Sequence, residues 1–543
     1  MKTKTILCAT LCAFALNINA EVCHYFFSPE GAGEQDGTSW ENAAPGEWLG
    51  ATLRGAEPGS EFWLMEGSYA ADDQLSWSIP EGIIIKGGYP TTSTGTNTFI
   101  DYNYNEGRQS VFSADLNGDG VGDNSDYAFV YIGKGKPGEK DDLFYKDFQL
   151  TSIYGCTFRD GRRLNSKYDG NMVLASAAKV DFHFCQFLNN QSPITDGGSK
   201  GSNGAIEAWG CQLRCFDCIF RDNLAATGGG GAFQVRARNS QSNPEDPADR
   251  SVALFNRCEL INNIAVDMSK DTTENSSWGT YGGAFSICDG GGTLYVLNST
   301  IANSRGRYRG VGVRVGGGGC ISYFINNTFF DNPCHQGPQN ATNNGSAISV
   351  GKGSTAYFAN NIAVDYAAND IFQSGNPVVY IQDATSQFFT AGYNVFGTVT
   401  NISTITTQWA ATDNIPASLE TLNTIETVFG GNKPAENGGW CKTIVPTKEV
   451  KGMKVTELQA AVAAWPLDDC VKDYLFLDTD ARGYTRAEVT MSGSYDAEGT
   501  SPNPETDLNN LRTNKKMIRK AIFGGQIVIL NGGKPYNVLG TEL

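Results

Sequence analysis

Histidine is scarce, charge is low and long apolar runs are almost absent from this sequence. Only three of its 543 residues are histidines (His24, His183 and His335), and charged residues make up 18%. Three scattered histidines argue against a multi-histidine metal centre. Beyond residue 20 there is no apolar run of about 18 residues, so no membrane-spanning helix is predicted. The glycine run at 316–319 lacks the rest of a phosphate-binding motif, and no nucleophile elbow emerges.

Positive charge is also in short supply. The chain carries 41 Lys and Arg against 58 Asp and Glu, a net charge of −17. A nucleic-acid partner is therefore not expected, because phosphate contacts need clustered Lys and Arg. Anionic polysaccharide is disfavoured only for the chain as a whole, since a local basic patch could still bind it. Solubility of an exported protein is the plainer explanation of the acidic balance.

The first twenty residues have the pattern of a signal peptide. Lys2 and Lys4 form the basic start, residues 6–16 are the apolar run, and Ala20 is the small residue before a cleavage point. Cys23 raises the alternative of a lipid anchor, but the residues before it are a poor lead-in to a lipidated cysteine. Simple cleavage and export are the preferred interpretation.

Glycine, aromatics and cysteine are abundant. The chain has 64 Gly, 11% aromatic residues and 14 Cys, a mixture typical of a β-rich exported protein with many turns. Cysteines in an exported protein usually indicate disulfides. Here Cys8 and Cys12 lie in the signal peptide, and the others are spread without tight pairing. Their spacing follows a repeat instead.

One short phrase recurs through the middle of the chain, with copies beginning 28 to 41 residues apart. A period of roughly 20 to 50 residues predicts a solenoid. The copies read GCTFRD from Gly155, FCQFLNN from Phe184, DCIFRDN from Asp217, RCELINN from Arg257, NSTIANS from Asn298, NNTFFDN from Asn326 and NNIAVDY from Asn360.

Two positions of the phrase, two residues apart, are expected to face one core. A spacing of two keeps residues on the same face of a strand. Coils stacked about 4.8 Å apart would place like residues above like. Buried Cys behaves as a small hydrophobe, so stacked thiols need not be paired. The two columns are Cys156, Cys185, Cys218, Cys258, Ser299, Asn327 and Asn361, and Phe158, Phe187, Phe220, Leu260, Ile301, Phe329 and Ala363.

Two residues further on, every copy has Asp or Asn. Short polar side chains tolerate the left-handed conformation and bond nearby backbone, as a sharp coil corner requires. A corner role is therefore preferred over catalysis for this column. Its members are Asp160, Asn189, Asp222, Asn262, Asn303, Asp331 and Asp365, with a further Asn often following at Asn190, Asn223, Asn263 and Asn332.

A second phrase interleaves with the first and supplies the companion strand of each coil. It reads NGAIEAW from Asn203, GGAFQVR from Gly230, GGAFSIC from Gly282, GVGVRVG from Gly310 and GSAISVG from Gly345. Glycine at a corner followed by alternating residues is typical of a strand start. Helical patterning is limited, with 456–465 the best candidate. The sequence therefore predicts an all-β, right-handed parallel β-helix, because the crossover helices of a doubly wound sheet are missing.

These phrases resemble the repeats of polymorphic outer membrane proteins and related exported bacterial β-helix proteins. The opening at 25–43, the segments from Pro58 and Gly82, and the phrases GYNVFG from Gly392 and DTDARGYTR from Asp478 extend the resemblance, the last two to the choice-of-anchor Q region. The resemblance implies a pectate-lyase-like solenoid that is secreted or displayed on the surface of a Gram-negative bacterium. Such families include adhesins, binding proteins and polysaccharide-active enzymes, so fold alone does not choose among them.

Five regions are expected along the chain. They are a signal peptide at 1–20, an N-terminal cap with the first coils at 21–110, β-helix repeats with inserted loops at 111–375, C-terminal coils and a closing segment at 376–500, and a linker with a C-terminal hairpin tail at 501–543. The tail has a hairpin signal around Asn531-Gly532-Gly533. It resembles sorting or attachment tails read by export machinery; a hairpin that only caps the solenoid is the alternative.

The segment DLNGDGVGDNSD, 115–126, fits a calcium-loop pattern. Alternating oxygen ligands in a glycine-permitted turn suit a hard cation that takes six to eight oxygens. The expected ligands of a structural Ca²⁺ are Asp115, Asn117, Asp119, Asp123 and Asp126. The flanking helices of an EF-hand are not evident, and a polar turn without metal is the competing interpretation.

A second candidate site lies on the companion strands. Residues that alternate with the apolar ones should point outward and stack from coil to coil. Trp packs on sugar faces, and Arg holds carboxylate or sulfate by bidentate bonds. An ordinary solvated strand face is the competing, preferred interpretation. The candidate residues for substrate binding are Glu207, Trp209, Gln234, Arg236, Ser286 and Arg314.

No catalytic residue is identified by the sequence, because solenoid sites assemble from separate coils. Three functions stay open. The first is a non-catalytic surface or secreted protein that binds carbohydrate or acts as an adhesin. The second is a polysaccharide lyase or glycoside hydrolase, which would need a carboxylate pair or an Arg or Lys base beside bound Ca²⁺. The third is a purely structural surface protein.

Overall fold

The computed structural model gives the fold of most of the chain. Among the described residues no helix is long and apolar enough to cross a membrane. The predicted signal peptide, at 1–20, lies outside the described residues. These are 23–71, 76–96, 110–115, 129–134, 148–161, 172–192, 204–225, 229–237, 250–265, 282–287, 292–306, 310–332, 347–365, 377–382, 384–397, 409–414, 423–429, 450–496 and 498–500, with the backbone of 519–523, 526–531 and 534–536.

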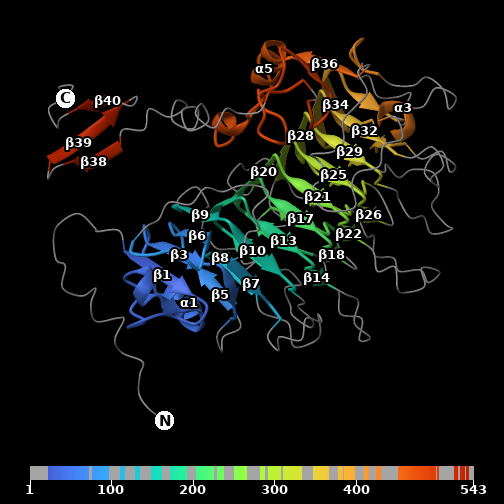
Figure 1. Cartoon of the computed structure of the whole chain (residues 1–543). Coiled ribbons are helices and arrows are strands. Elements are labelled where there is room, and N and C mark those ends of the chain that lie inside the picture. The colour runs from blue at the N-terminus through green and yellow to red at the C-terminus, as the bar shows by residue number, and fades with distance from the viewer. Residues whose placement is uncertain are drawn as a thin grey trace, which may run out of the picture.

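Three long parallel sheets form the walls of a right-handed β-helix (Figure 1). The first, sheet A, contains β2 (Ala44–Pro45), β1 (His24–Ser28), β3 (Glu61–Met65), β6 (Ile84–Tyr89), β9 (Leu150–Tyr154), β12 (Lys179–His183), β16 (Gln212–Phe216), β20 (Ser251–Asn256), β24 (Gly292–Leu297), β28 (Ile321–Ile325), β31 (Thr355–Ala359) and β34 (Gln387–Gly392).

Sheet B follows sheet A in each coil. It contains β4 (Gly67–Tyr69), β7 (Ser110–Ser113), β10 (Cys156–Arg159), β13 (Gln186–Leu188), β17 (Ile219–Arg221), β21 (Glu259–Ile261), β25 (Thr300–Ala302), β29 (Thr328–Phe330), β32 (Ile362–Val364) and β35 (Val395–Phe396). A four-stranded sheet then forms the turn in the middle coils: β14 (Gln191–Ser192), β18 (Leu224–Ala225), β22 (Ile264–Ala265) and β26 (Arg305–Gly306).

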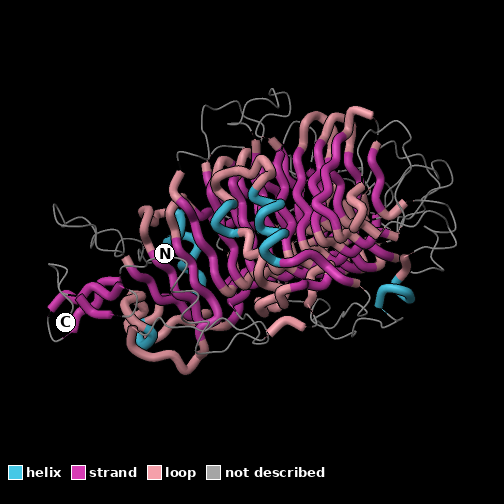
Figure 2. Tube along the Cα trace, turned by 90° about the horizontal axis from the view of Figure 1, so that it is seen from above, coloured by secondary structure: helices cyan, strands magenta, loops and turns pink. Residues whose placement is uncertain are grey.

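Sheet C closes each coil. Its strands are β5 (Ser76–Ile79), β8 (Phe129–Gly133), β11 (Val173–Ser176), β15 (Ile206–Trp209), β19 (Phe233–Arg236), β23 (Phe285–Ile287), β27 (Val313–Val315), β30 (Ile348–Val350) and β33 (Val379–Ile381). The chain thus runs from β16 through β17, β18 and β19 before β20 pairs beside β16. Seen from above, the strands stack along one axis (Figure 2). The predicted fold class is confirmed.

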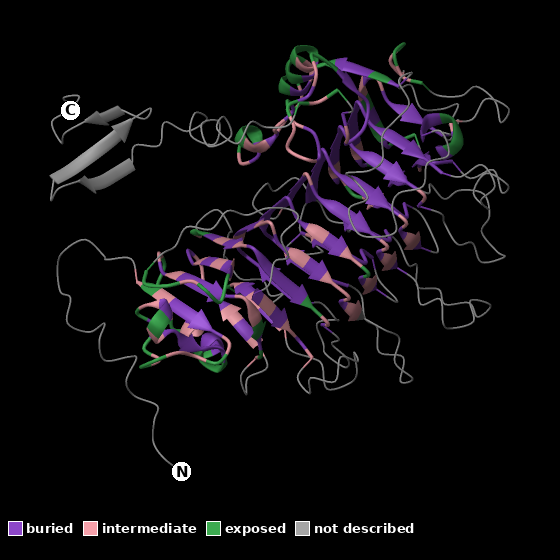
Figure 3. Cartoon of the chain, in the orientation of Figure 1, coloured by how far each residue is buried: buried purple, intermediate pink, exposed green. Residues whose placement is uncertain are grey.

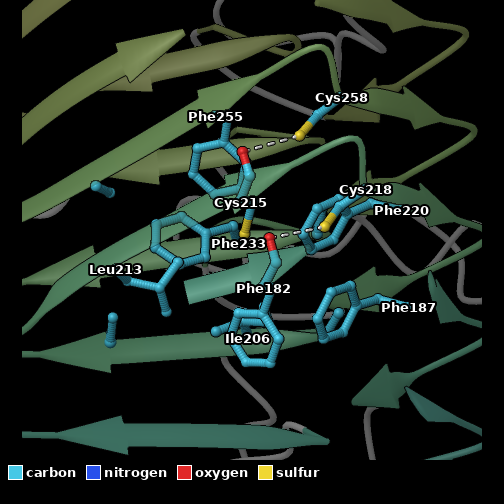
Figure 4. Close-up of a cluster of buried hydrophobic side chains, with 14 of the residues drawn as sticks. Phe182, Phe187, Ile206, Leu213, Cys215, Cys218, Phe220, Phe233, Phe255 and Cys258 are labelled. Atoms are coloured by element: carbon cyan, nitrogen blue, oxygen red, sulfur yellow. Dashed lines mark hydrogen bonds between the residues drawn. The ribbon is translucent and has the colours of Figure 1, made fainter. Parts of the chain in front are cut away.

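The predicted core columns are in register. Phe158 pairs with Phe187, and Phe187 with Phe220, on successive strands of sheet B. The Phe187 and Phe220 rings stack with centroids 4.6 Å apart. The column of Cys156, Cys185, Cys218 and Cys258 lies in the same buried cluster. Figure 3 shows that the strands of the walls are mostly buried, and Figure 4 shows Cys218 and Cys258 beside Phe187 and Phe220. Thiols donate to carbonyls of neighbouring coils: the Cys258 Sγ lies 3.4 Å from the Cys215 oxygen.

Among the described residues, Cys156, Cys215, Cys218 and Cys258 are free thiols. Burial raises the pKa of the Cys156 and Cys215 thiols well above its usual range. Since the reagent cannot reach a fully buried side chain, we expect Cys156, Cys215, Cys218 and Cys258, all 0% exposed, to escape alkylation by iodoacetamide at pH 8 in the native protein. They should be alkylated in urea. Peptide mass spectrometry checks this residue by residue, and native labelling at Cys218 would contradict the buried ladder.

The Asp/Asn column occupies the corner between sheet B and the next strand. Asp160, Asn189, Asp222, Asn262, Asn303 and Asp331 all have positive φ, from 49° to 62°. Beside it the following Asn side chains bond from coil to coil: Asn190 Nδ2 donates to Asn223 Oδ1 at 3.0 Å. Asp365 departs from the prediction. It has no positive φ and accepts from the Asn332 backbone N–H at 2.8 Å, so it takes the ladder position instead of the corner.

The two ends of the core are covered by aromatic residues and short helices. At the N-terminal end Leu49 and Leu53 join the central core, whereas Phe26, Trp40, Trp63 and Tyr89 form a separate cluster on the outer face of sheet A. Helix α1 (Leu49–Arg54) and the 3-10 turns at Trp40–Asn42 and Gly46–Trp48 lie in the same region of the sequence. At the other end Trp409 packs on Phe388 with ring centroids 4.3 Å apart, and α3 (Ile425–Phe429) joins a small cluster on the outside of sheet B.

The segment 450–500, here called the closing segment, returns to the outer face of sheet A. It contains β36 (Lys451–Lys454), α5 (Val455–Ala463), a 3-10 turn at Lys472–Tyr474 and β37 (Val489–Met491). The helix expected at 456–465 is α5. Leu458 and Val462 of α5 are buried against Tyr295, Tyr323 and other outward side chains of sheet A. The tail forms an antiparallel sheet of β38 (Arg519–Phe523), β39 (Gln526–Asn531) and β40 (Lys534–Tyr536).

Candidate functional site

The six candidate binding residues come from four neighbouring strands of sheet C. The register aligns Glu207 of β15 with Gln234 of β19, Gln234 with Ser286 of β23, and Ser286 with Arg314 of β27. We call this line the polar row. Trp209 and Arg236 are paired in the next line, two residues further along β15 and β19. The coils therefore bring together residues that are up to 107 positions apart in the sequence.

The polar row faces away from the core. Its neighbours on the same strands, Ile206, Ala208 and Val235 among them, belong to the central apolar cluster. Yet Glu207, Gln234 and Ser286 are only 3%, 2% and 1% exposed. The expectation of a solvated strand face is wrong for these three residues. Arg236 and Arg314 keep partial exposure.

Arg236 is the centre of the local contacts. Its Nε lies 3.0 Å from Glu207 Oε1, and its Nη2 donates to Gln234 Oε1 at 3.0 Å. The guanidinium also lies over the Trp209 ring, 4.9 Å from the centroid. Glu207 and Gln234 thus hold the Arg236 guanidinium in place over the Trp209 ring.

Two polar atoms near Arg236 are buried without a hydrogen-bond partner in the part of the chain that the structure describes. They are the Trp209 Nε1 and the Ser286 Oγ. Buried polar atoms in folded proteins are nearly always satisfied, so an orphan needs an explanation such as water or a ligand. Both residues lie on the outer side of sheet C, on strands β15 and β23.

The calcium-loop prediction falls mostly outside the described residues. Asn117, Asp119, Asp123 and Asp126 are not described. Asp115 follows β7, and its backbone N–H donates to Ser113 Oγ at 3.3 Å. Within the described ranges no group of three or more His, Cys, Asp or Glu side chains could hold a metal ion. The Ca²⁺ site stays a prediction.

A charged cluster on the outer face of sheet A was missed by the sequence analysis. Arg214 donates to both Asp181 carboxylate oxygens at 2.7 Å, and both residues are 4% exposed. Arg214 also donates to the Cys470 carbonyl at 3.0 Å and lies 4.0 Å from the Tyr474 ring centroid. This ion pair therefore helps to anchor the closing segment.

The signal for this cluster was present in the repeat. Asp181 and Arg214 each lie four residues before a ladder cysteine, Cys185 and Cys218, so the column register places them side by side. His183 lies between them and the ladder, stacked on Tyr154 and Phe216 with centroids 4.5 and 4.8 Å apart. His183 therefore has a packing role on this face.

Comparison with known proteins gives similarity of fold at low identity. The pectate lyase Pel9A has a TM-score of 0.40 and 12% identity, covering 88% of this chain and 97% of that one. A rhamnogalacturonan lyase has a TM-score of 0.30 and 14% identity, covering 68% and 87%. Tailspike protein 3 of bacteriophage CBA120 has a TM-score of 0.26 and 11% identity, covering 76% and 65%.

Neither a family model nor a curated protein matches the chain. The resemblance to polymorphic outer membrane protein repeats and to the choice-of-anchor Q region therefore stays a prediction.

Proposed function

We propose that this chain is an exported β-helix protein that binds carbohydrate, as an adhesin or binding module, along the outer face of sheet C. The binding residues are Arg236, Trp209 and Arg314, with Glu207, Gln234 and Ser286 beneath them. A rigid solenoid presents an extended face, which suits a polymeric ligand.

One observation carries the proposal. Glu207, Gln234 and Ser286 of the polar row are buried on the outer face of a sheet. Among the described residues, the Ser286 Oγ and, in the neighbouring line, the Trp209 Nε1 have no hydrogen-bond partner. Apolar side chains would be more stable in that place, because burying polar atoms costs free energy unless they are bonded. The polar residue types are therefore better explained by an interaction than by stability.

Catalysis is the second candidate, as a polysaccharide lyase or glycoside hydrolase. Acid–base cleavage by a hydrolase would need a second carboxylate. Elimination by a lyase would need a basic side chain beside a cation. Among the six described residues Glu207 is the single carboxylate, and its partner is Arg236. This favours binding over hydrolysis. A purely structural surface protein is the third candidate, and it gives no reason for the orphan atoms.

Replacing Arg236 with Ala should lower affinity for the bound polysaccharide at least about tenfold, because the guanidinium orders Glu207, Gln234 and Trp209. Arg221→Ala is the matched control. Arg221 is 31% exposed against 28% for Arg236, and it lies 4.0 Å from another buried glutamate, Glu259, on sheet B. Calorimetry against neutral and acidic plant, host and bacterial polysaccharides measures both variants, with products assayed in parallel.

Equal affinities of the two variants would remove the polar row from the site. If the wild type releases sugar products and the Glu207→Gln variant does not, the protein is an enzyme instead.

Calcium at the 115–126 loop and attachment through the C-terminal tail complete the proposal. Removal of Ca²⁺ by EDTA should lower the Tm of the wild type but not of Asp119→Asn, because a bound ion stabilises only the folded state. Differential scanning fluorimetry checks this. Equal melting of both proteins in Ca²⁺ and in EDTA would indicate a loop without metal. Removing residues 501–543 should release a surface-attached protein into the medium.

A further inference from the structure

The position of the two orphan atoms limits what can bind beside Arg236. Trp209 lies on β15 and Ser286 on β23, with β19 between them. Trp209 is also two residues further along its strand than the polar row that contains Ser286. Two strand spacings and two residues of rise put the two positions roughly 12 Å apart. One sugar ring is too small to meet both atoms.

The chemistry of the two atoms fits hydroxyl groups. The Trp209 Nε1 only donates, whereas the Ser286 hydroxyl donates and accepts. A sugar hydroxyl can accept a hydrogen bond from the Trp209 Nε1. It can either donate to or accept from the Ser286 hydroxyl. The line from Trp209 to Ser286 crosses Gln234 and Arg236, whose polar atoms are already joined at 3.0 Å.

The charge along that line is balanced. The Glu207 carboxylate and the Arg236 guanidinium neutralise each other at 3.0 Å. An acidic sugar placed between Trp209 and Ser286 would lie beside the Glu207 carboxylate without a cation of its own on the line. Arg314 lies one coil beyond Ser286, outside it.

Other orphan atoms do not share this setting. Trp77 is fully buried within the central core, and Ser304 lies in the corner ladder, where its backbone N–H donates to Asn332 Oδ1. No external group reaches either place. Trp63 belongs to the N-terminal aromatic cluster. Glu259 Oε2 lies on sheet B, 4.0 Å from Arg221. On the outer face of sheet C, the Trp209 Nε1 and the Ser286 Oγ lie on either side of the Arg236 Nε, which has Glu207 Oε1 at 3.0 Å.

We propose that the Trp209 Nε1 and the Ser286 Oγ are two hydroxyl-binding positions of one subsite, which takes an uncharged stretch of glycan at least two sugars long, lying diagonally across β15, β19 and β23. This rests on the proposed function. It adds the length of the ligand, its neutral character and its direction on the sheet.

Stability and affinity separate this role from a structural one. Ser286→Ala removes a hydroxyl that has no hydrogen-bond partner among the described residues, so the Tm should stay unchanged or rise. Its affinity for a neutral hexasaccharide should fall about tenfold. Ser354→Ala is the control, because the Ser354 Oγ is buried and donates to the Gly316 carbonyl at 2.5 Å. That variant should lose Tm and keep its affinity.

The probes are gluco-, manno-, xylo-, arabino- and galacto-hexasaccharides, the matching monosaccharides and hexagalacturonate, measured by calorimetry. Binding of a neutral hexasaccharide, with no binding of its monosaccharide, and reduced affinity in both Ser286→Ala and Trp209→Phe are expected. A Tm loss in Ser286→Ala equal to that of Ser354→Ala would reveal an ordered water instead and overturn the inference. Preference for hexagalacturonate, or no bound neutral hexasaccharide, would also overturn it. If Arg236→Ala abolishes polysaccharide binding while Ser286→Ala does not weaken it, the proposed function survives and this subsite does not.

Discussion

Arg486→Met should lower the free energy of unfolding by about 3–5 kcal/mol, because a buried cation is removed from a network of buried acceptors. Arg486 is 4% exposed. Its Nε donates to the Thr479 carbonyl at 2.9 Å, and its Nη2 donates to the Gly493 carbonyl at 3.0 Å and to Asn298 Oδ1 at 3.2 Å. Asn298 directly follows β24 of sheet A, so one side chain joins the closing segment to the solenoid.

Two opposing effects decide the size of this loss. Burial lowers the pKa of the Arg486 guanidinium to about 10, which means that its charge is held at a desolvation cost. Methionine recovers that cost but leaves several buried acceptors unsatisfied, and it also removes the positive charge near the fully buried Asp480 and Asp496. Unsatisfied groups cost about 1–3 kcal/mol each, so the loss dominates.

Urea denaturation followed by circular dichroism measures the effect. Lys472→Met is the control in the same segment, because the Lys472 and Asp469 side chains are 53% and 96% exposed. Exposed ion pairs contribute little, so no shift of the midpoint is expected for this variant. An Arg486→Met protein as stable as the wild type would show that apolar packing alone holds the closing segment.

Phe220→Ala should lower the free energy of unfolding by about 3–5 kcal/mol, the usual effect of replacing a large buried side chain by Ala. Phe220 is fully buried in the middle of the Phe column, stacked on Phe187 at 4.6 Å and in edge contact with Phe255 at 5.7 Å. Neighbouring coils are tied by backbone bonds on three sheets. The cavity is therefore expected to stay open, which places the loss near the upper end of the range.

The adjacent residue provides the control for this core prediction. Ile219 lies on the same strand, β17, but points to the opposite face and is partly exposed. Ile219→Ala should cost at most about 1 kcal/mol. The same urea titration compares the two variants. Equal losses would mean that the inward and outward faces of sheet B are assigned the wrong way round.

The Asp181–Arg214 pair shows how far repeat alignment reaches. The offset of four residues before the ladder cysteines fixes that the two side chains are neighbours, and this much was available from the sequence. The offset does not predict that the closing segment packs on this pair. Its residues Cys470 and Tyr474 lie 256 and 260 positions beyond Arg214. No local pattern links them, because their contact depends on packing between distant parts of the chain.

The sequence by itself determined the β-helix, its inward Cys and Phe columns and its left-handed Asp/Asn corners. These depend on strand alternation and on conformational preferences that each repeat carries locally. It also predicted which side chains of the second phrase leave the core. Only the tertiary structure decided that Glu207, Gln234 and Ser286 are buried, that Arg236 pairs with Glu207, and that the closing segment covers sheet A. Insertions of different length separate the coils. The register between coils and the contacts of the closing segment on sheet A are therefore set by packing between residues that are far apart in the sequence.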